Sequence, residues 1–461
     1  MTSLALRSAN PEPLVAAGAV GLVACGAVGV AAGALGGGSA LGVVGGATAA
    51  TGVFVLLAAG WIDWLTLLVL SLAVPAPFAT ASLRLAPAAA VTAAVVLAWC
   101  LRSALDRRPL ALGHGARLAI VALFAAVVLS AILSANPAAG AREVLNWALL
   151  LAVFAIAVTE FRRDPRKIHD VALVIATVMA FGGALAICQA AGVLPSAFRW
   201  GSAFNRATLG FGWPNELGMF MAIGLPFSVH AARAATGRFG RTVAWLGVLA
   251  TIGGLAASFS RGSWVAVALA TLILFARGER AFAVRIWGAI LIAGFVIDLV
   301  SGGAVGGRFT SIDGQLAVGQ RFALMLTGLL MFRANPLVGV GPGGFEGALA
   351  EFGPRIAILW DYVGSAHNLY IHMAAETGII GLAALVSLLT LCAAAAYRGA
   401  RPLKARERAG SSRDDSLRRA ILWSFSTACL VGLFEWSFPH GVGQLILLVG
   451  AMALSGEEGG G

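Results

Sequence analysis

The chain has 461 residues, of which 59% are hydrophobic and only 11% are charged. Soluble domains carry roughly a quarter charged residues, so this composition excludes a soluble globular fold. The net charge of +11 does not indicate nucleic-acid binding, because membrane proteins accumulate Lys and Arg in their cytoplasmic loops. We therefore predict an all-α, polytopic membrane protein that contacts membrane lipids and has no nucleic-acid partner.

Apolar runs long enough to cross a membrane recur along the whole chain. A helix of about 20 apolar residues spans the roughly 30 Å of bilayer hydrocarbon. The predicted spans are 14–34, 40–59, 61–80, 86–104, 118–134, 145–161, 170–192, 215–232, 243–259, 262–277, 286–301, 367–397, 420–436 and 440–455. The first two are rich in Gly and Ala, so we expect about 12–14 transmembrane helices.

The distribution of basic residues predicts the orientation. With the N-terminus in the cytoplasm, 23 of the 32 Lys and Arg residues fall on the cytoplasmic side, eight of them in 398–419. Cytoplasmic loops are enriched in Lys and Arg, so we expect both termini in the cytoplasm. The other nine basic residues are arginines on the outer side, where the two long segments 193–214 and 302–366 also lie.

These features predict three parts: N-terminal transmembrane helices (1–192), a catalytic core (193–397), and a basic cytoplasmic loop with a C-terminal hairpin (398–461). Within the core, residues 320–332 place apolar side chains at helical spacing. We expect this helix to lie along the membrane interface or to lean into the bundle. The Gly- and Pro-rich residues 335–344 that follow it predict a sharp turn.

Three of the outward arginines suggest a binding site, because the topology does not require them there. Arg206 precedes the span 215–232, Arg261 lies at the tight turn SFSRGSW, and Arg321 opens the predicted interfacial helix. A guanidinium offers a planar fork of donors and a permanent charge, which suits a phosphate or diphosphate group. Such a site needs no metal, although each arginine could instead extend to the outer interface.

His367 stands at the outer mouth of the span 367–397. A free histidine has a pKa of about 6.5 and accepts protons near neutral pH, so we predict a general base, with a structural role as the alternative. His372 and Glu376 are spaced i, i+4. Without a third ligand, they predict a buried hydrogen-bonded pair rather than a metal site. Glu435 is an isolated acidic residue near a span end, and no role is predicted for it.

Three segments resemble the core of the O-antigen ligase and O-antigen polymerase superfamily: SFSRGSWVA, QRFALMLTGLLMFRANPLVGVGPGGFEG and SAHNLYIHMAAETGIIGL, in that order. The similarity covers about residues 200–390. It implies a GT-C-type helical fold, and glycan transfer from undecaprenyl diphosphate without a metal or other cofactor. It also places this chemistry on the periplasmic face of the bacterial inner membrane.

The resemblance also implies residue roles. Arg206 and Arg261 would hold the diphosphate, and Arg321 would complete the clamp. Asn215, in the turn after the first arginine, is a weaker candidate for the same site. His367 would act as base on the acceptor hydroxyl, in a single displacement that inverts the anomeric centre.

Two acceptors share every motif: lipid A–core for a ligase, or a growing glycan for a polymerase. We prefer the ligase. A lipid-linked-oligosaccharide transporter is a further alternative, but it predicts charges through the bilayer depth and an internal repeat. This chain instead gathers its arginines and histidine at one face, which favours an enzyme.

Overall fold

The computed structural model describes residues 87–194, 199–200, 204–209, 211, 213–300, 312–353, 364–400, 412–436, 438 and 441–456. It divides into two compact units, Met1–Pro109 and Leu110–Gly461. Helix α4 (Pro87–Leu105) is the described part of the first unit and matches the predicted span 86–104. The predicted spans 14–34, 40–59 and 61–80 lie outside the described residues.

The described residues of the second unit are helical apart from one pair of two-residue strands and short connections. Its elements are α5 (His114–Ile132), α6 (Pro137–Arg163), α7 (Arg166–Ala190), β1 (Arg199–Trp200), β2 (Phe204–Asn205), α8 (Pro214–Ala234), α9 (Arg238–Ala257), α10 (Arg261–Ala276), α11 (Arg280–Val300), α13 (Ile312–Ala334), α14 (Phe345–Phe352), α15 (Leu369–Gly399), α17 (Ser412–Val431) and α18 (Val442–Ser455). Every span predicted from 118–134 onward overlaps one of these helices.

Length and apolar composition make six helices of the described part able to cross a membrane: α5 to α9 and α15. Helices α10 and α18 are shorter and also apolar. The predicted all-α, polytopic class is therefore confirmed. The total number of spans stays a prediction, because three of the predicted spans precede the described residues.

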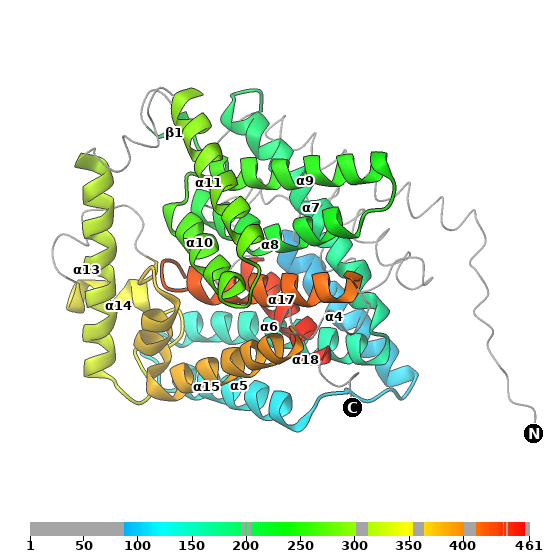
Figure 1. The fold of residues 1–461 in the computed structure, drawn as a ribbon. Coiled ribbons are helices and arrows are strands. Elements are labelled where there is room, and N and C mark those ends of the chain that lie inside the picture. The colour runs from blue at the N-terminus through cyan, green and yellow to red at the C-terminus, as the bar shows by residue number, and fades with distance from the viewer. Residues whose placement is uncertain are drawn as a thin grey trace, which may run out of the picture. The chain divides into compact units, whose positions relative to one another are not determined.

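Helix α8 is the core of the second unit and is buried along nearly its whole length. It packs against α7, α9 and α17, while α15 packs against α5, α13, α17 and α18 (Figure 1). Such a helix, apolar on all sides, needs neighbours around its full circumference. Helices α8 and α17 also pack against each other. The polar groups described below lie at the two ends of this helix pair.

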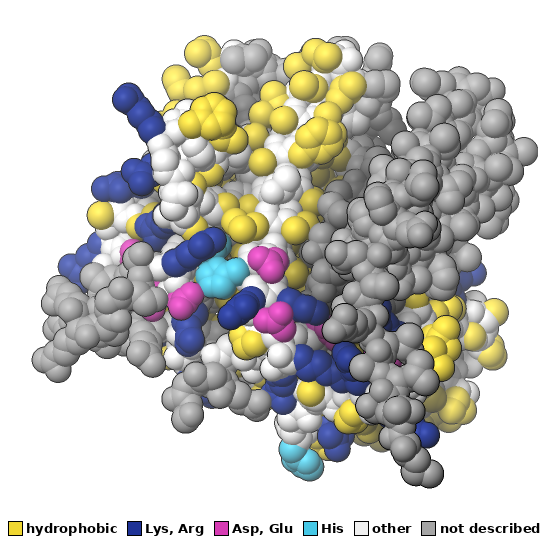
Figure 2. All heavy atoms as spheres, turned by 90° about the vertical axis from the view of Figure 1, so that its right-hand side faces the viewer, with side chains coloured by type: hydrophobic (Ala, Val, Ile, Leu, Met, Phe, Trp, Pro, Cys, Tyr) yellow, Lys and Arg dark blue, Asp and Glu magenta, His cyan; other side chains and the backbone are white. Residues whose placement is uncertain are grey.

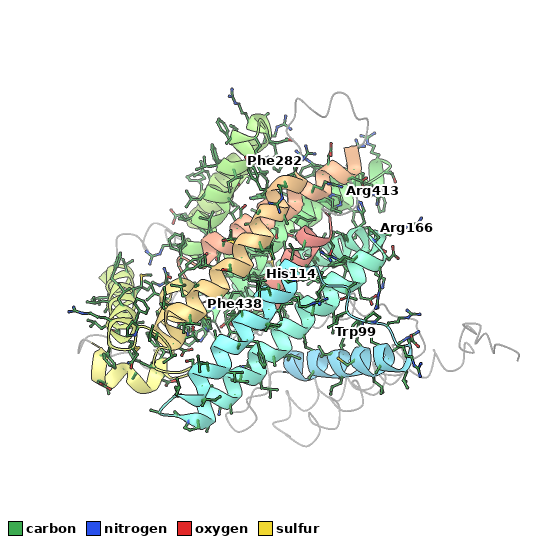
Figure 3. All side chains as sticks on the ribbon, turned by 90° about the horizontal axis from the view of Figure 1, so that it is seen from below. Trp99, His114, Arg166, Phe282, Arg413 and Phe438 are labelled. Carbon is green, nitrogen blue, oxygen red and sulfur yellow. The ribbon has the colours of Figure 1, made fainter. Side chains whose placement is uncertain are left out.

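One end of the α8–α17 pair is basic. We call it the Arg413 end, after a residue at the start of α17. There His169, near the start of α7, contacts Asp414 at 2.9 Å, and His230, near the end of α8, contacts Ser416 at 3.2 Å. Arg166 and Arg413 lie together at this end (Figure 3), and Figure 2 shows the Lys and Arg side chains gathered there. Arg166 and Arg413 belong to segments predicted on the cytoplasmic side, and that orientation stays a prediction.

The Gly- and Pro-rich residues 335–344 pack against a break in α15. Gly378, within α15, has φ +65°, and a Cβ atom there would lie 2.2 Å from the carbonyl carbon of Leu337. Carbonyl groups left without helical partners at the break accept hydrogen bonds from the turn. Val340 N donates to Ala375 O at 2.9 Å, and Gly341 N donates to Glu376 O at 3.0 Å. Glycine is required where two backbones approach this closely.

Helix α13 differs from the prediction in its start. It begins at Ile312, so Arg321 lies well inside the helix rather than opening it. Helix α13 packs on α14 and α15, at one edge of the bundle (Figure 1). It leaves an apolar row exposed, formed by Phe322, Leu326, Leu329 and Leu330. Helix α14 was not predicted.

Candidate active site

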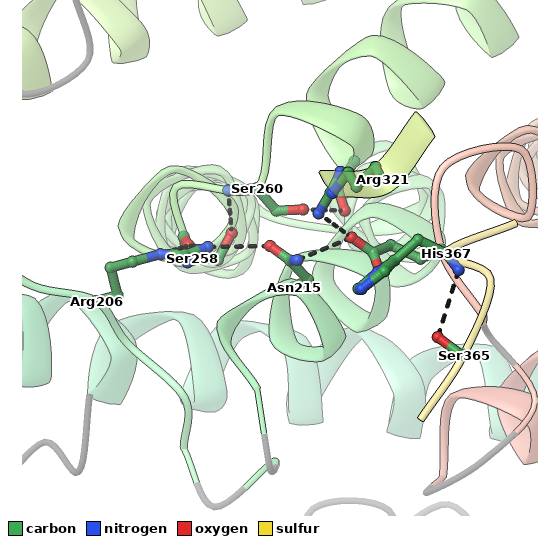
Figure 4. A network of polar contacts seen from close by, with 9 residues as sticks. Arg206, Asn215, Ser258, Ser260, Arg321, Ser365 and His367 are labelled. Carbon is green, nitrogen blue, oxygen red and sulfur yellow. Dashed lines mark hydrogen bonds and ion pairs between the residues drawn. The ribbon is translucent and has the colours of Figure 1, made fainter. Parts of the chain in front are cut away.

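Glu435 is the centre of a polar network at the other end of the α8–α17 pair, which we call the Glu435 end. Figure 4 shows Arg206, Asn215, Arg321 and His367 in this network. It lies in the connection between α17 and α18, and its side chain is only 8% exposed. One oxygen, Oε1, accepts hydrogen bonds from Arg321 Nη2 and, at 2.8 Å, from Asn215 Nδ2. The other, Oε2, lies 2.7 Å from His367 Nδ1. A single carboxylate thus joins three of the predicted site residues.

The charges around Glu435 keep it ionised. Burial by itself would raise the pKa of this carboxyl, but Arg321 and His367 act in the opposite direction. Their combined effect holds the pKa of Glu435 below its usual range, because nearby positive charges and hydrogen-bond donors stabilise the anion. Glu435 is therefore a permanent negative charge at neutral pH.

The position of His367 is fixed by the residues that follow it. Asn368 caps α15 by accepting from Tyr370 N and Ile371 N, and its Nδ2 donates to Leu433 O at 3.0 Å. Leu369 N donates to Gly432 O at 2.6 Å. These bonds attach the start of α15 to the connection that carries Glu435. The residues next to His367 and those just before Glu435 are thus hydrogen-bonded to each other, which keeps the two side chains in contact.

The geometry of His367 suits proton transfer. Nδ1 faces the Glu435 carboxylate, so Nδ1 carries the hydrogen and donates it. Nε2 is then the basic nitrogen, and it has no hydrogen-bond partner among the described residues. The imidazole is partly accessible, at 22% exposed. His367 also has φ +47°, a conformation that costs a non-glycine residue energy and that concentrates at functional sites.

Arg206 is brought into the network, but part of its hydrogen-bonding capacity is used structurally. It is buried, and it donates to Ser258 O from Nε at 3.0 Å and from Nη2 at 2.8 Å. Ser258 ends α9, where helix carbonyl groups lack partners. Nη2 also donates to Asn215 Oδ1 at 3.0 Å. Arg206 therefore closes a helix end and orients Asn215 towards Glu435.

Arg261 is the first residue of α10 and lies on the same side of the bundle as Arg321. Its turn packs closely on the Glu435 connection, because a Cβ atom at Gly262 would lie 2.8 Å from Phe434 Cβ. The positive charge of Arg321 acts on Arg261, so the two guanidinium groups are neighbours. Arg206, Asn215, Arg321 and His367 thus form one network with Glu435, and Arg261 lies near Arg321 at the same end.

The electrostatics of this network favour an anion. Arg321 donates to Glu435, the positive charge of Arg206 also acts on that carboxylate, and Arg261 lies near Arg321. Positive charge is therefore concentrated near a basic imidazole nitrogen. Like charges held together repel one another, and a bound anion would relieve this repulsion.

The predicted pair of His372 and Glu376 is confirmed as a buried contact, with 3.4 Å between Nε2 and Oε2. Glu435 was missed, because its partners lie 68 and 114 residues away in the sequence. One signal could have found it. An ionisable residue within an apolar segment marks function by default, and the charge count places Glu435 on the same side as His367.

Part of the chain is similar to a known protein family. No curated protein matches the chain. Residues 246–386 match the profile of a family described as O-Antigen ligase. That stretch contains Arg261, Arg321 and His367, and the family indicates a glycosyltransferase of the O-antigen ligase and polymerase type. The predicted resemblance is confirmed over residues 246–386, which are similar to the O-antigen ligase family.

Proposed function

We propose that this protein is an O-antigen ligase-like glycosyltransferase that moves a glycan from undecaprenyl diphosphate to an acceptor hydroxyl. The observation that carries this proposal is the Glu435 network. It holds the imidazole of His367 and the guanidinium of Arg321 on one buried carboxylate. A proton acceptor and an anion-binding group are thereby presented together.

His367 is the base in this proposal. Nε2 takes the proton of the acceptor hydroxyl while that oxygen attacks the anomeric carbon of the donor sugar. Glu435 stabilises the imidazolium that forms, because its carboxylate lies 2.7 Å from Nδ1. The bond between the anomeric carbon and the diphosphate oxygen breaks, with inversion at carbon. A positioned base of this kind contributes about 10²- to 10⁴-fold to the rate.

The arginines act on the leaving group. Negative charge develops on the diphosphate as the bond breaks, and guanidinium groups stabilise it. Arg321 uses Nη2 for Glu435, which leaves its other nitrogens to face the donor. Arg261 stands beside it, and Arg206 with Asn215 supports the same region from behind. These groups supply the charge stabilisation without a metal or cofactor.

The periplasmic face of the bacterial inner membrane is the proposed location, with lipid A–core as acceptor. The polymerase alternative uses the same chemistry with a growing glycan as acceptor. A transporter is disfavoured, because the ionisable groups of the network cluster at the Glu435 end rather than along the bundle. The exposed apolar row of α13 adjoins this end and suits a lipid-linked donor.

The test is genetic complementation. The gene is deleted in its native bacterium and restored as wild type, His367→Ala or His169→Ala, and lipopolysaccharide is separated on a gel. Loss of all core-attached O-antigen, with polymer accumulating on the lipid carrier, indicates a ligase. Core capped by a single repeat indicates a polymerase. Normal ladders with His367→Ala would refute the assignment of His367 as base.

A further inference from the structure

We propose that His372 is a positioning residue that holds His367 and Glu435 in their mutual geometry. This inference rests on the proposed function and deepens it. His372 lies in the first turns of α15 and is 2% exposed, so it does not reach substrate. It contacts both chain segments that form the His367–Glu435 pair.

The first contact is with the segment of His367. Ala366 N donates to His372 Nδ1 at 3.4 Å, and Ala366 directly precedes His367. The backbone at His367 has φ +47°, so an outside contact is needed to hold the chain in that conformation. His372 supplies one on the N-terminal side, while the Asn368 cap supplies another on the C-terminal side.

The second contact is with the segment of Glu435. The imidazole of His372 packs against the indole of Trp436, with 4.2 Å between ring centroids. Trp436 directly follows Glu435. Trp436 also has the ring of Phe438 as a neighbour, with 6.3 Å between ring centroids. The ring of His372 therefore limits the movement of the Glu435 segment relative to α15.

The third contact anchors His372 itself. Because Nδ1 accepts from Ala366, Nε2 carries the hydrogen, and it lies 3.4 Å from Glu376 Oε2. The second oxygen of Glu376 accepts from Phe345 N at 3.1 Å, and its main-chain oxygen accepts from Gly341 N at 3.0 Å. The Gly- and Pro-rich turn thus fixes Glu376, Glu376 fixes His372, and His372 fixes the pair above it.

The kinetic test uses the purified full-length protein with His372→Phe and His372→Gln. Phenylalanine keeps a ring against Trp436 but loses both polar contacts, whereas glutamine can still accept from Ala366 and donate to Glu376. Misplacing a reacting group by about 1 Å costs about 100-fold. We expect His372→Phe to lower kcat by about 10- to 100-fold with little change in KM for the donor, and His372→Gln to fall between Phe and wild type.

The matched control is His230→Phe. His230 is equally buried, also bonds through Nδ1, and lies at the Arg413 end. Thermal unfolding of every variant gives the folded fraction, to which kcat is normalised. If His230→Phe lowers the normalised kcat as much as His372→Phe does, His372 has no positioning role.

A second measurement does not depend on activity. Carbethoxylation of His367 at a fixed pH is followed by mass spectrometry, since the reagent attacks an accessible imidazole nitrogen. In the wild type this imidazole is held against Glu435 and is 22% exposed. We therefore expect the rate of modification to rise in His372→Phe, where the ring is held less firmly, and to rise by less in His372→Gln. Unchanged rates in both variants would overturn the proposal. Absence of glycosyl transfer by the wild type would refute the proposed function alone, because this rate does not depend on it.

Discussion

The two ends of the α8–α17 pair hold similar pairs of residues but use them differently. Both ends have an arginine–glutamate contact and a histidine–carboxylate contact. At the Arg413 end these use two carboxylates, Glu279 for Arg419 and Asp414 for His169. At the Glu435 end one carboxylate serves both Arg321 and His367. Sharing a carboxylate places a base beside a cationic group.

Burial separates the two histidine–carboxylate contacts further, whereas Arg419 and Glu279 at the Arg413 end are each only 13% exposed. The side chain of Asp414 is 65% exposed, against 8% for Glu435. Exposed ion pairs contribute about 0–1 kcal/mol, whereas a buried charge must be satisfied by its neighbours or becomes strongly destabilising. The His169–Asp414 contact therefore adds little to stability. The buried carboxylate of Glu435, in contrast, requires α8, α13 and the start of α15 to keep their positions around it. The following experiments contrast matched residues at the two ends.

Replacing the two histidines should give the largest contrast. His367→Ala removes the proposed base, and glycosyl transfer should fall by about 10²- to 10⁴-fold. His169→Ala removes an equivalent histidine–aspartate contact and should leave transfer close to wild type. The measurement is the rate of transfer from a lipid-linked donor by purified protein. Equal losses in the two variants would show that the ends do not differ in function.

Replacing the two arginines should give the next largest effect. Arg321→Gln removes a donor aimed at the leaving diphosphate, and kcat should fall by about 10²- to 10³-fold. Arg419→Gln breaks a contact of the same type and should lower stability without lowering kcat per folded molecule. Turnover is normalised to the folded fraction from thermal unfolding. A kcat for Arg321→Gln like that of the wild type would remove Arg321 from the site.

Glu435→Gln tests the shared carboxylate. Loss of a side chain that hydrogen-bonds to a functional histidine typically lowers activity by about 10- to 100-fold. We expect kcat to fall by a factor in this range. The loss should be in kcat rather than in KM for the donor, because the neutral amide no longer stabilises the imidazolium that forms in the transition state. Asp414→Asn serves as the control and should leave kcat unchanged. A kcat for Glu435→Gln like that of the wild type would contradict the pairing of Glu435 with His367.

The smallest expected contrast is in acid stability. The pKa of Glu435 is held below its usual value of 4.5 in the folded protein. The unfolded chain therefore binds this proton first as the pH falls, and the stabilisation is complete above about pH 4.5 and lost below it. Thermal unfolding between pH 7 and pH 3 should show this loss in the wild type and less of it in Glu435→Gln. Asp414→Asn should follow the wild type, because its pair is exposed.

The sequence by itself determined the membrane class and most helices of the second unit. Apolar runs of membrane-spanning length are local signals, which is why the runs at 215–232 and 243–259 each correspond to a helix. The short helix α14 and the true start of α13 were not predicted, because neither is marked by a long apolar run.

The candidate site was partly readable from the sequence. Charge counting placed Arg206, Arg261, Arg321 and His367 on one side, and the structure gathers them. Asn215 was a weaker candidate, yet it bonds directly to Glu435. The predicted catalytic core, 193–397, does not include Glu435, whose segment reaches the site from the connection between α17 and α18.

Only the tertiary structure decided which groups touch. A carboxylate becomes a hub when burial removes water and the fold leaves it only a few partners, and neither condition is visible in the residues around Glu435. The sequence determined that arginines and a histidine occur on one side of a membrane bundle. Packing of α8, α13, α15 and α17 determined that they meet on one buried acid, because contacts between distant segments depend on how the helices pack rather than on local pattern.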